Sequence, residues 1–158
     1  RIYIKFLMSK KILFVCVENA GRSQMAEGFF RKYAPTGYEP YSAGTKPTGA
    51  INPLAIQAMK ESGIDITTQT PKTITNSMMR EASKVINMGC MDRESCPALF
   101  VKNVLDWAIE DPKGKPLEDV RKIRDTIEKR LVIHDPAKSH HASRSTLPNA
   151  TAGQENAA

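Results

Sequence analysis

The segment KILFVCVENAGRSQMAEGFF, residues 11–30, decides the fold of this chain. Its first part, Lys11 to Val17, is a continuous apolar run rich in β-branched residues, which is typical of a strand buried on both faces of a parallel sheet. From Arg22 to Tyr33 the apolar residues recur at helical spacing, and Ala34-Pro35 then ends the pattern. The segment therefore predicts a strand, a short loop and a helix in direct succession.

The rest of the chain continues this alternation. Further strands are predicted over residues 39–42, 84–88 and 104–109, and further helices over residues 53–62, 74–81 and 116–133. Alternating strands and helices indicate an α/β fold, with a parallel sheet, helices on both faces and right-handed crossovers. Ligands bind such sheets at the carboxyl ends of the strands, and the first strand ends at Cys16.

The composition is that of a globular protein. The chain has 158 residues, of which 41% are hydrophobic and 25% are charged, and this length suits one domain. We expect a single catalytic domain over residues 8–135, with Met8 as the natural start and residues 1–7 as an N-terminal extension. Residues 136–158 are too polar to pack, and we expect a disordered tail there.

Charge and cysteine usage narrow the function further. The net charge is +6, but the densest basic stretch, Arg121 to Arg130, mixes both signs at helical spacing, so we expect no nucleic-acid partner. No apolar run approaches the roughly 20 residues that span a bilayer, so we expect no membrane partner. Three cysteines without an export signal favour a reducing compartment, the cytoplasm.

The loop between the first strand and its helix has the features of an anion site. A loop of this length can point successive backbone N–H groups inward as a nest, and the helix N-terminus adds its positive end. These fields favour the thiolate of Cys16, which makes it a candidate nucleophile at neutral pH. The loop residues are Val17, Glu18, Asn19, Ala20, Gly21, Arg22 and Ser23.

Individual side chains in this loop suit the same chemistry. Arg22 offers a planar fork of donors that can hold two oxygens of a phosphate-like ligand. Ser23 can donate to the sulfur, Asn19 can brace the loop, and Gly21 allows tight backbone geometry. The alternative is a buried core cysteine, a common state for this residue type. The combination of cysteine, arginine and serine between a strand and a helix favours the functional interpretation.

Four segments of the chain resemble the low-molecular-weight protein tyrosine phosphatase superfamily, in particular its arsenate reductases. They are FVCVENAGRSQMAEGFF at 14–30, YSAGT at 41–45, NPLAIQAMKESGIDI at 52–66 and WAIEDP at 107–112. The resemblance implies a three-layer sandwich with a four-stranded parallel sheet. It also implies Cys16 as the nucleophile, Arg22 as the oxyanion clamp and no organic cofactor.

Asp111-Pro112 follows the last predicted strand and so lies at the same sheet edge as Cys16. A carboxyl group there could protonate the leaving oxygen of an oxyanion, a transfer worth about 10²- to 10⁴-fold. Asp-Pro is also a common turn. In the family the aspartate before this proline is the general acid, and the resemblance implies that role for Asp111.

The segment GCMDRESCPA, residues 89–98, resembles the redox segment of thioredoxin-coupled arsenate reductases. That resemblance implies a relay in which Cys90 attacks the sulfur of a Cys16-arsenic adduct and Cys96 then forms a Cys90-Cys96 disulfide. Thioredoxin or a similar dithiol protein would be the reductant. Two alternatives stay open: two inert buried thiols, or a metal site, although the five-residue gap does not match a zinc knuckle and we expect no metal.

Asn19, Glu27, Ser42 and Asp65 match positions that bind a monovalent cation such as K⁺ in some related reductases. Glu27 is otherwise an ordinary helix residue and Asp65 an ordinary loop acid. The sequence thus predicts a thiol-dependent arsenate reductase acting on arsenate or a similar oxyanion. A phosphatase that works through a cysteinyl-phosphate and a non-catalytic oxyanion-binding module are the two alternatives.

Overall fold

The computed structural model describes residues 9–89 and 104–133. The strands are β1 (Lys10–Cys16), β2 (Tyr38–Gly44), β3 (Ala82–Asn87) and β4 (Val104–Asp106). The helices are α2 (Arg22–Tyr33), α3 (Pro53–Glu61), α4 (Asn76–Glu81) and α5 (Leu117–Ile133). All the elements predicted within these residues are present, and most ends agree within one or two residues.

The four strands form one parallel sheet in the order β2-β1-β3-β4. Val15 of β1 pairs with Asn87 of β3, which pairs in turn with Asp106 of β4. Three strands therefore end at one level, and the segments that follow them meet at one edge of the sheet. The predicted four-stranded α/β fold is confirmed.

The last strand is shorter than the predicted range of 104–109. The backbone N–H of Trp107 still donates to the carbonyl of Asn87 at 2.8 Å, but the N–H of Ile109 donates back to the carbonyl of Trp107 at 2.9 Å. This tight turn takes the chain out of the sheet after Asp106. An apolar run cannot distinguish a strand from such a turn, because the turn buries Trp107 and Ile109 as well.

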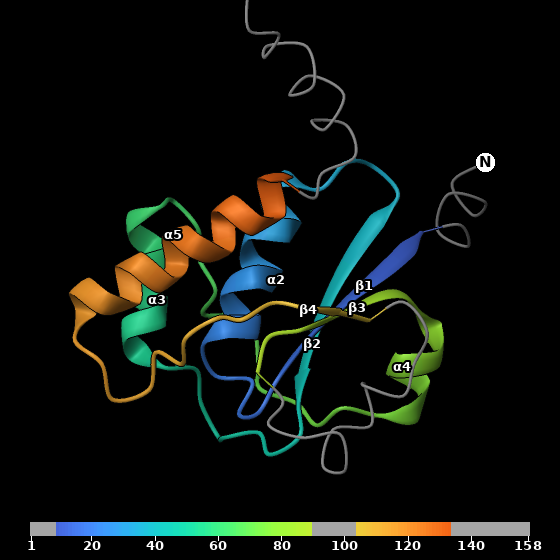
Figure 1. The fold of residues 1–158 in the computed structure, drawn as a ribbon, viewed down its shortest axis with the longest axis horizontal. Coiled ribbons are helices and arrows are strands. Elements are labelled where there is room, and N and C mark those ends of the chain that lie inside the picture. The colour runs from blue at the N-terminus through green and yellow to red at the C-terminus, as the bar shows by residue number, and fades with distance from the viewer. Residues whose placement is uncertain (1–8, 90–103, 134–158) are drawn as a thin grey trace, which may run out of the picture.

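Helices cover both faces of the sheet, as Figure 1 shows: α2, α3 and α5 lie on one side and α4 on the other. Successive residues of β1 alternate between the two resulting cores. Ile12, Phe14 and Cys16 belong to the larger core with α2, whereas Leu13 and Val15 belong to the smaller core with α4. This double burial explains the continuous apolar run of residues 11–17, and it puts Cys16 on the α2 side.

The cap residue and the proline predicted at the start of α3 both take their expected positions. The side chain of Asn52 accepts a hydrogen bond from the N–H of Leu54 at 2.9 Å, and Pro53 occupies the first turn. Both features stabilise a helix start. In the part of the chain that the structure describes, none of the helices combines the length and the apolar character that crossing a membrane requires.

Candidate active site

The loop between β1 and α2 is held from outside by the segment 45–52. Backbone N–H groups of this segment donate to four carbonyl oxygens at the end of β1 and in the loop. The carbonyl of Cys16 accepts from Thr45 at 3.3 Å, that of Val17 from Lys46 at 2.8 Å, that of Glu18 from Thr48 at 3.1 Å and that of Ala20 from Asn52 at 2.9 Å. A trans peptide group points its N–H away from its C=O. Turning the carbonyls outward therefore turns the next N–H groups inward, which builds a cup lined by backbone donors.

The sulfur of Cys16 lies inside this cup, and the residue is only 2% exposed. Its Sγ accepts a hydrogen bond from the N–H of Asn19 at 3.2 Å and lies 2.8 Å from the hydroxyl of Ser23. That hydroxyl accepts a bond from Nδ2 of Asn19 at 2.7 Å, which leaves its own proton free for the sulfur. The N–H of Asn19, the hydroxyl of Ser23 and the N-terminus of α2 therefore all lie beside the sulfur.

Asn19 holds the loop in shape. Its φ of 52° lies in the left-handed region, which asparagine tolerates better than most residues. Its side-chain oxygen accepts hydrogen bonds from Nε2 of Gln24 at 3.1 Å and from the N–H of Lys72 at 2.9 Å. The buried amide of Asn19 is therefore bonded at both ends and fixes the curve of the cup.

Arg22, the first residue of α2, is 8% exposed and reaches across to the ends of other strands. Its Nη1 donates to the carbonyl of Met88 at 2.9 Å and, less closely, to that of Ile109 at 3.4 Å. Gly89, with φ +138°, makes room for it, because a Cβ there would lie 1.9 Å from Nη1. The guanidinium is thus oriented in advance, before any ligand is bound.

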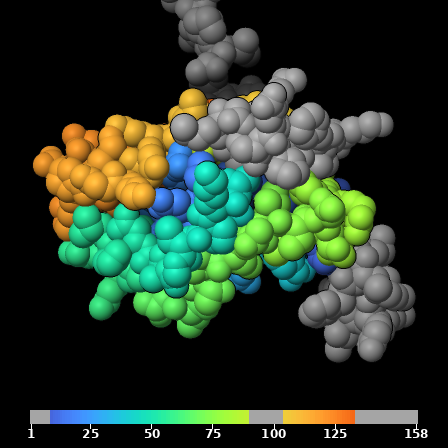
Figure 2. Space-filling model, turned by 90° about the horizontal axis from the view of Figure 1, so that it is seen from below, coloured from blue at the N-terminus to red at the C-terminus, as the bar shows by residue number. Residues whose placement is uncertain are grey.

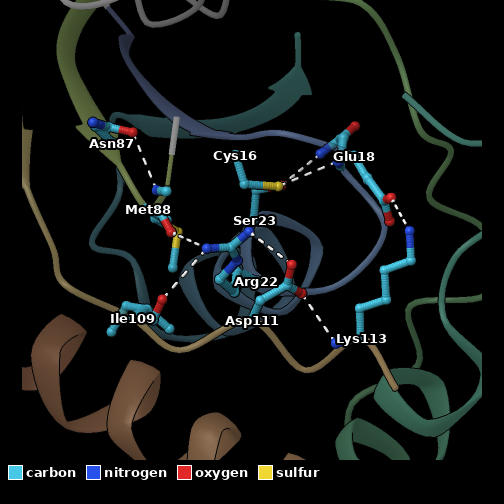
Figure 3. Close-up of polar contacts among 11 residues, drawn as sticks. Cys16, Glu18, Arg22, Ser23, Asn87, Met88, Ile109, Asp111 and Lys113 are labelled. Atoms are coloured by element: carbon cyan, nitrogen blue, oxygen red, sulfur yellow. Dashed lines mark hydrogen bonds and ion pairs between the residues drawn. The ribbon is translucent and has the colours of Figure 1, made fainter. Parts of the chain in front are cut away.

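Asp111 stands opposite the cup. Its Oδ2 lies 3.5 Å from Nη2 of Arg22, and its Oδ1 accepts a hydrogen bond from the N–H of Lys113 at 3.0 Å (Figure 3). The next residue, Pro112, packs directly on the loop, since a Cβ on Gly21 would lie 2.7 Å from its Cγ. The carboxyl group, which is 54% exposed, therefore faces both the guanidinium and the solvent.

These groups surround a hollow of about 380 Å³. Figure 2 shows the blue loop recessed between the teal segment near residue 50 and the orange segment near residue 112. The described lining consists of Cys16, Glu18, Ala20, Gly21, Arg22, Thr48, Ala50, Ile51, Asn52, Pro53, Asp111, Pro112 and Lys113. Within that described lining there is no aromatic side chain.

Sequence reasoning missed two residues of the site, Gly89 and Lys113. The Nζ of Lys113 lies 2.6 Å from Oε1 of Glu18, and this hydrogen bond raises the pKa of the lysine. A lysine after Asp-Pro has no local signal that sets it apart from a solvated surface residue. A glycine directly after a buried strand, in contrast, could have indicated the close approach of another group at position 89.

Two of the four candidate cation ligands lie together. Ser42 is fully buried, and its hydroxyl has no hydrogen-bond partner within the described residues. It nevertheless lies close enough to the carboxylate of Glu27 to lower the pKa of that group. Burial acts in the opposite direction and more strongly, so the pKa of Glu27 is raised. An unpartnered buried oxygen beside a buried carboxyl group fits a small cation.

The other two candidates are less available. The side-chain oxygen of Asn19 already accepts two hydrogen bonds. Asp65 is exposed, and its Oδ1 accepts hydrogen bonds from the N–H and hydroxyl of Thr67, which lower its pKa. The structure thus brings Glu27 and Ser42 together, while Asn19 and Asp65 are occupied by bonds of their own.

The predicted relay cysteines, Cys90 and Cys96, lie outside the described residues. The described chain reaches Gly89, beside Arg22, one residue before Cys90. Across residues 9–89 and 104–133 there is no cluster of three or more His, Cys, Asp or Glu that could hold a metal ion.

Fold and site together define a class: parallel α/β proteins that hold a cysteine sulfur in an anion-binding loop at the start of a helix. A family model described as low molecular weight phosphotyrosine protein phosphatase matches residues 11–134. The chain belongs to this family.

Named relatives within the family include arsenate reductases. The chain is 38% identical to an arsenate reductase of Staphylococcus aureus strain Newman over 123 residues, which are 77% of this chain and 92% of the relative. A solved structure of an arsenate reductase in the phosphate binding state is 36% identical with a TM-score of 0.69, over 77% of this chain and 93% of that one.

Two other solved structures show the range of the family. A thioredoxin-dependent arsenate reductase of Corynebacterium glutamicum is 33% identical with a TM-score of 0.63, over 86% of this chain and 64% of that one. An arginine phosphatase of Geobacillus stearothermophilus is 25% identical with a TM-score of 0.70, over 87% of this chain and 99% of that one. Reduction and phosphate hydrolysis therefore both occur on this fold.

Proposed function

We propose that this protein is an arsenate reductase that reduces arsenate to arsenite with electrons from thiols. The observation that carries the proposal is the position of Gly89 against the guanidinium of Arg22, since Cys90 is the next residue in the sequence and Cys96 follows six residues later. A phosphatase needs no further thiol, because water completes its reaction. The likeness to named arsenate reductases supports the same choice.

The first step forms a bond between Cys16 and arsenic. Arsenate enters the cup, where backbone N–H groups and Arg22 hold its oxygens. The thiolate of Cys16 attacks arsenic, an As–O bond breaks, and the proton of Asp111 goes to the departing oxygen, which leaves as water. Arsenic remains in oxidation state V in this adduct. The pairing of Asp111 with Arg22 in the ligand-free protein keeps both groups beside the incoming anion.

The second step is the reduction. The thiolate of Cys90 attacks the sulfur of Cys16, an S–S bond forms, and the electron pair of the S–As bond goes to arsenic, which leaves as arsenite. The thiolate of Cys96 then attacks the sulfur of Cys90 and releases Cys16. The product is a Cys90-Cys96 disulfide, which a dithiol protein such as thioredoxin reduces with two electrons. We place this chemistry in the cytoplasm, where such reductants keep thiols reduced.

The proposal is tested by following arsenite production with a thioredoxin system for the wild type, Cys16→Ser, Cys90→Ser and Cys96→Ser. We expect no arsenite from Cys16→Ser or Cys90→Ser, and at most one arsenite per enzyme from Cys96→Ser. Mass spectrometry of Cys96→Ser after one turnover should show a Cys16-Cys90 disulfide. Full turnover by Cys90→Ser and Cys96→Ser would contradict the relay.

The second candidate is a phosphatase, favoured by the phosphatases among the structural neighbours. The same three residues, Cys16, Arg22 and Asp111, would then act through a cysteinyl-phosphate that water hydrolyses. Hydrolysis of p-nitrophenyl phosphate should in that case proceed at high rates in the wild type and in both relay variants.

We propose further that Glu27 and Ser42 bind a monovalent cation such as K⁺ beside the loop. The buried, unpartnered hydroxyl of Ser42 and the buried carboxyl of Glu27 support this assignment. Such an ion would add to the positive charge that Arg31, 3.9 Å from the carboxylate of Glu27, already supplies, without taking part in the reaction. A rise in thermal stability on replacing sodium chloride by potassium chloride, lost in Glu27→Gln, would support the site.

A further inference from the structure

An ion pair crosses the mouth of the site and joins its two sides. Glu18 belongs to the cup, whereas Lys113 follows the Asp111-Pro112 turn, 95 residues later in the chain. Their side chains meet at 2.6 Å, and both residues line the hollow above Cys16. In Figure 3 the two side chains approach each other beside Asp111.

The position of Glu18 poses an electrostatic problem. A carboxylate in a loop that binds dianionic oxyanions repels the ligand. Lys113 offsets this repulsion, because a cation at hydrogen-bonding distance from Glu18 opposes the field of its carboxylate. The pair is partly exposed, with 69% exposure for the lysine and 29% for the glutamate, so its contribution to the stability of the fold is small.

The same pair acts on Asp111. The backbone N–H of Lys113 donates to Oδ1 of Asp111 at 3.0 Å, so the residue that is tied to Glu18 also orients the candidate acid. Within residues 9–89 and 104–133, the other polar contact of the Asp111 side chain is the longer one of 3.5 Å with Arg22. The Lys113 side chain therefore ties the turn that carries Asp111 to the loop that carries Cys16.

We propose that Glu18 and Lys113 form a positioning pair that holds Asp111 over the cup and keeps the cup open to dianions. The inference deepens the proposed function and rests on the binding of a tetrahedral oxyanion at Cys16. Neither residue touches the reacting atoms. The pair acts through Asp111 and through the charge at the mouth.

Replacing each partner by methionine distinguishes the positioning of Asp111 from the effect on the charge at the mouth of the site. Lys113→Met leaves a bare carboxylate beside the cup, so phosphate affinity should fall about three- to tenfold. Glu18→Met removes the repulsion, so phosphate affinity should stay equal or rise. Both variants break the pair, so both should lower the rate of adduct formation about tenfold. In an Asp111→Asn background neither change should lower that rate further.

Phosphate affinity is measured as the protection of Cys16 from iodoacetamide by inorganic phosphate, followed by mass spectrometry of the Cys16 peptide. Adduct formation is followed with arsenate, and with p-nitrophenyl phosphate in parallel. A failure of arsenate reduction in the wild type would overturn the proposed function, whereas the phosphate and p-nitrophenyl phosphate measurements would still test the pair.

The control is Lys115→Met, which breaks the nearby ion pair between Lys115 and Glu110. Neither residue of that pair is among the described lining residues of the hollow, so affinity and rate should equal those of the wild type. The charge-swapped double variant Glu18→Lys with Lys113→Glu should regain most of the rate lost by either single variant. Affinity shifts of the same sign in Lys113→Met and Glu18→Met, or equal rate losses with and without Asp111, would overturn the proposal.

Discussion

Replacing Gly89 by alanine should disable the site although it changes none of the side chains that we expect to contact the ligand. The new Cβ would lie 1.9 Å from Nη1 and 2.7 Å from Cζ of Arg22. An ordinary carbon contact is about 3.5 Å, so the guanidinium must move by roughly 1.6 Å. That movement breaks its 2.9 Å hydrogen bond to the carbonyl of Met88 and removes it from the oxyanion.

The magnitude follows from the role of the guanidinium. Loss of one oxyanion donor costs about 10²- to 10³-fold, and a misplacement of about 1 Å can cost about 10²-fold. We therefore expect Gly89→Ala to lower kcat/KM for arsenate about 100-fold or more. Protection of Cys16 by inorganic phosphate should weaken to a similar degree.

A matched control separates this collision from backbone strain. Gly37 also has a left-handed φ, +97°, but a Cβ there meets nothing within 4 Å. Gly37→Ala should therefore suffer the strain, of order 1–3 kcal/mol, and keep its activity at temperatures where it is folded. If folded Gly89→Ala bound phosphate within a factor of two of the wild type, the reasoning would be refuted.

Three further predictions follow from the contacts of the site. Ser23→Ala removes the hydroxyl 2.8 Å from the sulfur and should slow the alkylation of Cys16 by iodoacetate at pH 7 about tenfold; an unchanged rate would contradict this. Gly21→Ala drives a Cβ to 2.7 Å from Cγ of Pro112 and should push the Asp-Pro turn away, lowering kcat with little change in phosphate affinity. Glu27→Gln tests a buried charge: burial raises the folded-state pKa above its ordinary value of 4.5, so the wild type loses stability as pH rises through that raised value. In urea unfolding without K⁺, the free energy of unfolding of Glu27→Gln should therefore exceed that of the wild type at neutral pH. This difference should shrink as the pH falls below 4.5, and a difference that does not change with pH would argue against the raised pKa.

Much of the architecture could be predicted from local patterns. The apolar run of β1 marks a strand buried on both faces, and Asn52 with Pro53 marks the start of α3. Such signals come from helix caps or from the periodicity of buried residues. Both involve residues that are close in sequence, so they can be recognised in the sequence itself. The position of Cys16 between a strand and a helix predicted a site for the same reason.

The contacts between distant segments of the site could not be predicted from any short stretch of sequence. Arg22 bonds to the carbonyl of Met88, 66 residues away, and Lys113 pairs with Glu18, 95 residues away. The early end of β4 belongs with them, because the turn at Ile109 carries the chain toward Arg22.

The chain alone therefore specified the elements, the parallel sheet and the loop around Cys16. Only the tertiary structure decided which carbonyls orient Arg22, which glycine makes room for it and which lysine covers Glu18. The physical reason is that hydrogen bonds and ion pairs form within about 3–4 Å. Whether two distant segments come that close depends on the path of the whole backbone, which no short stretch of residues contains.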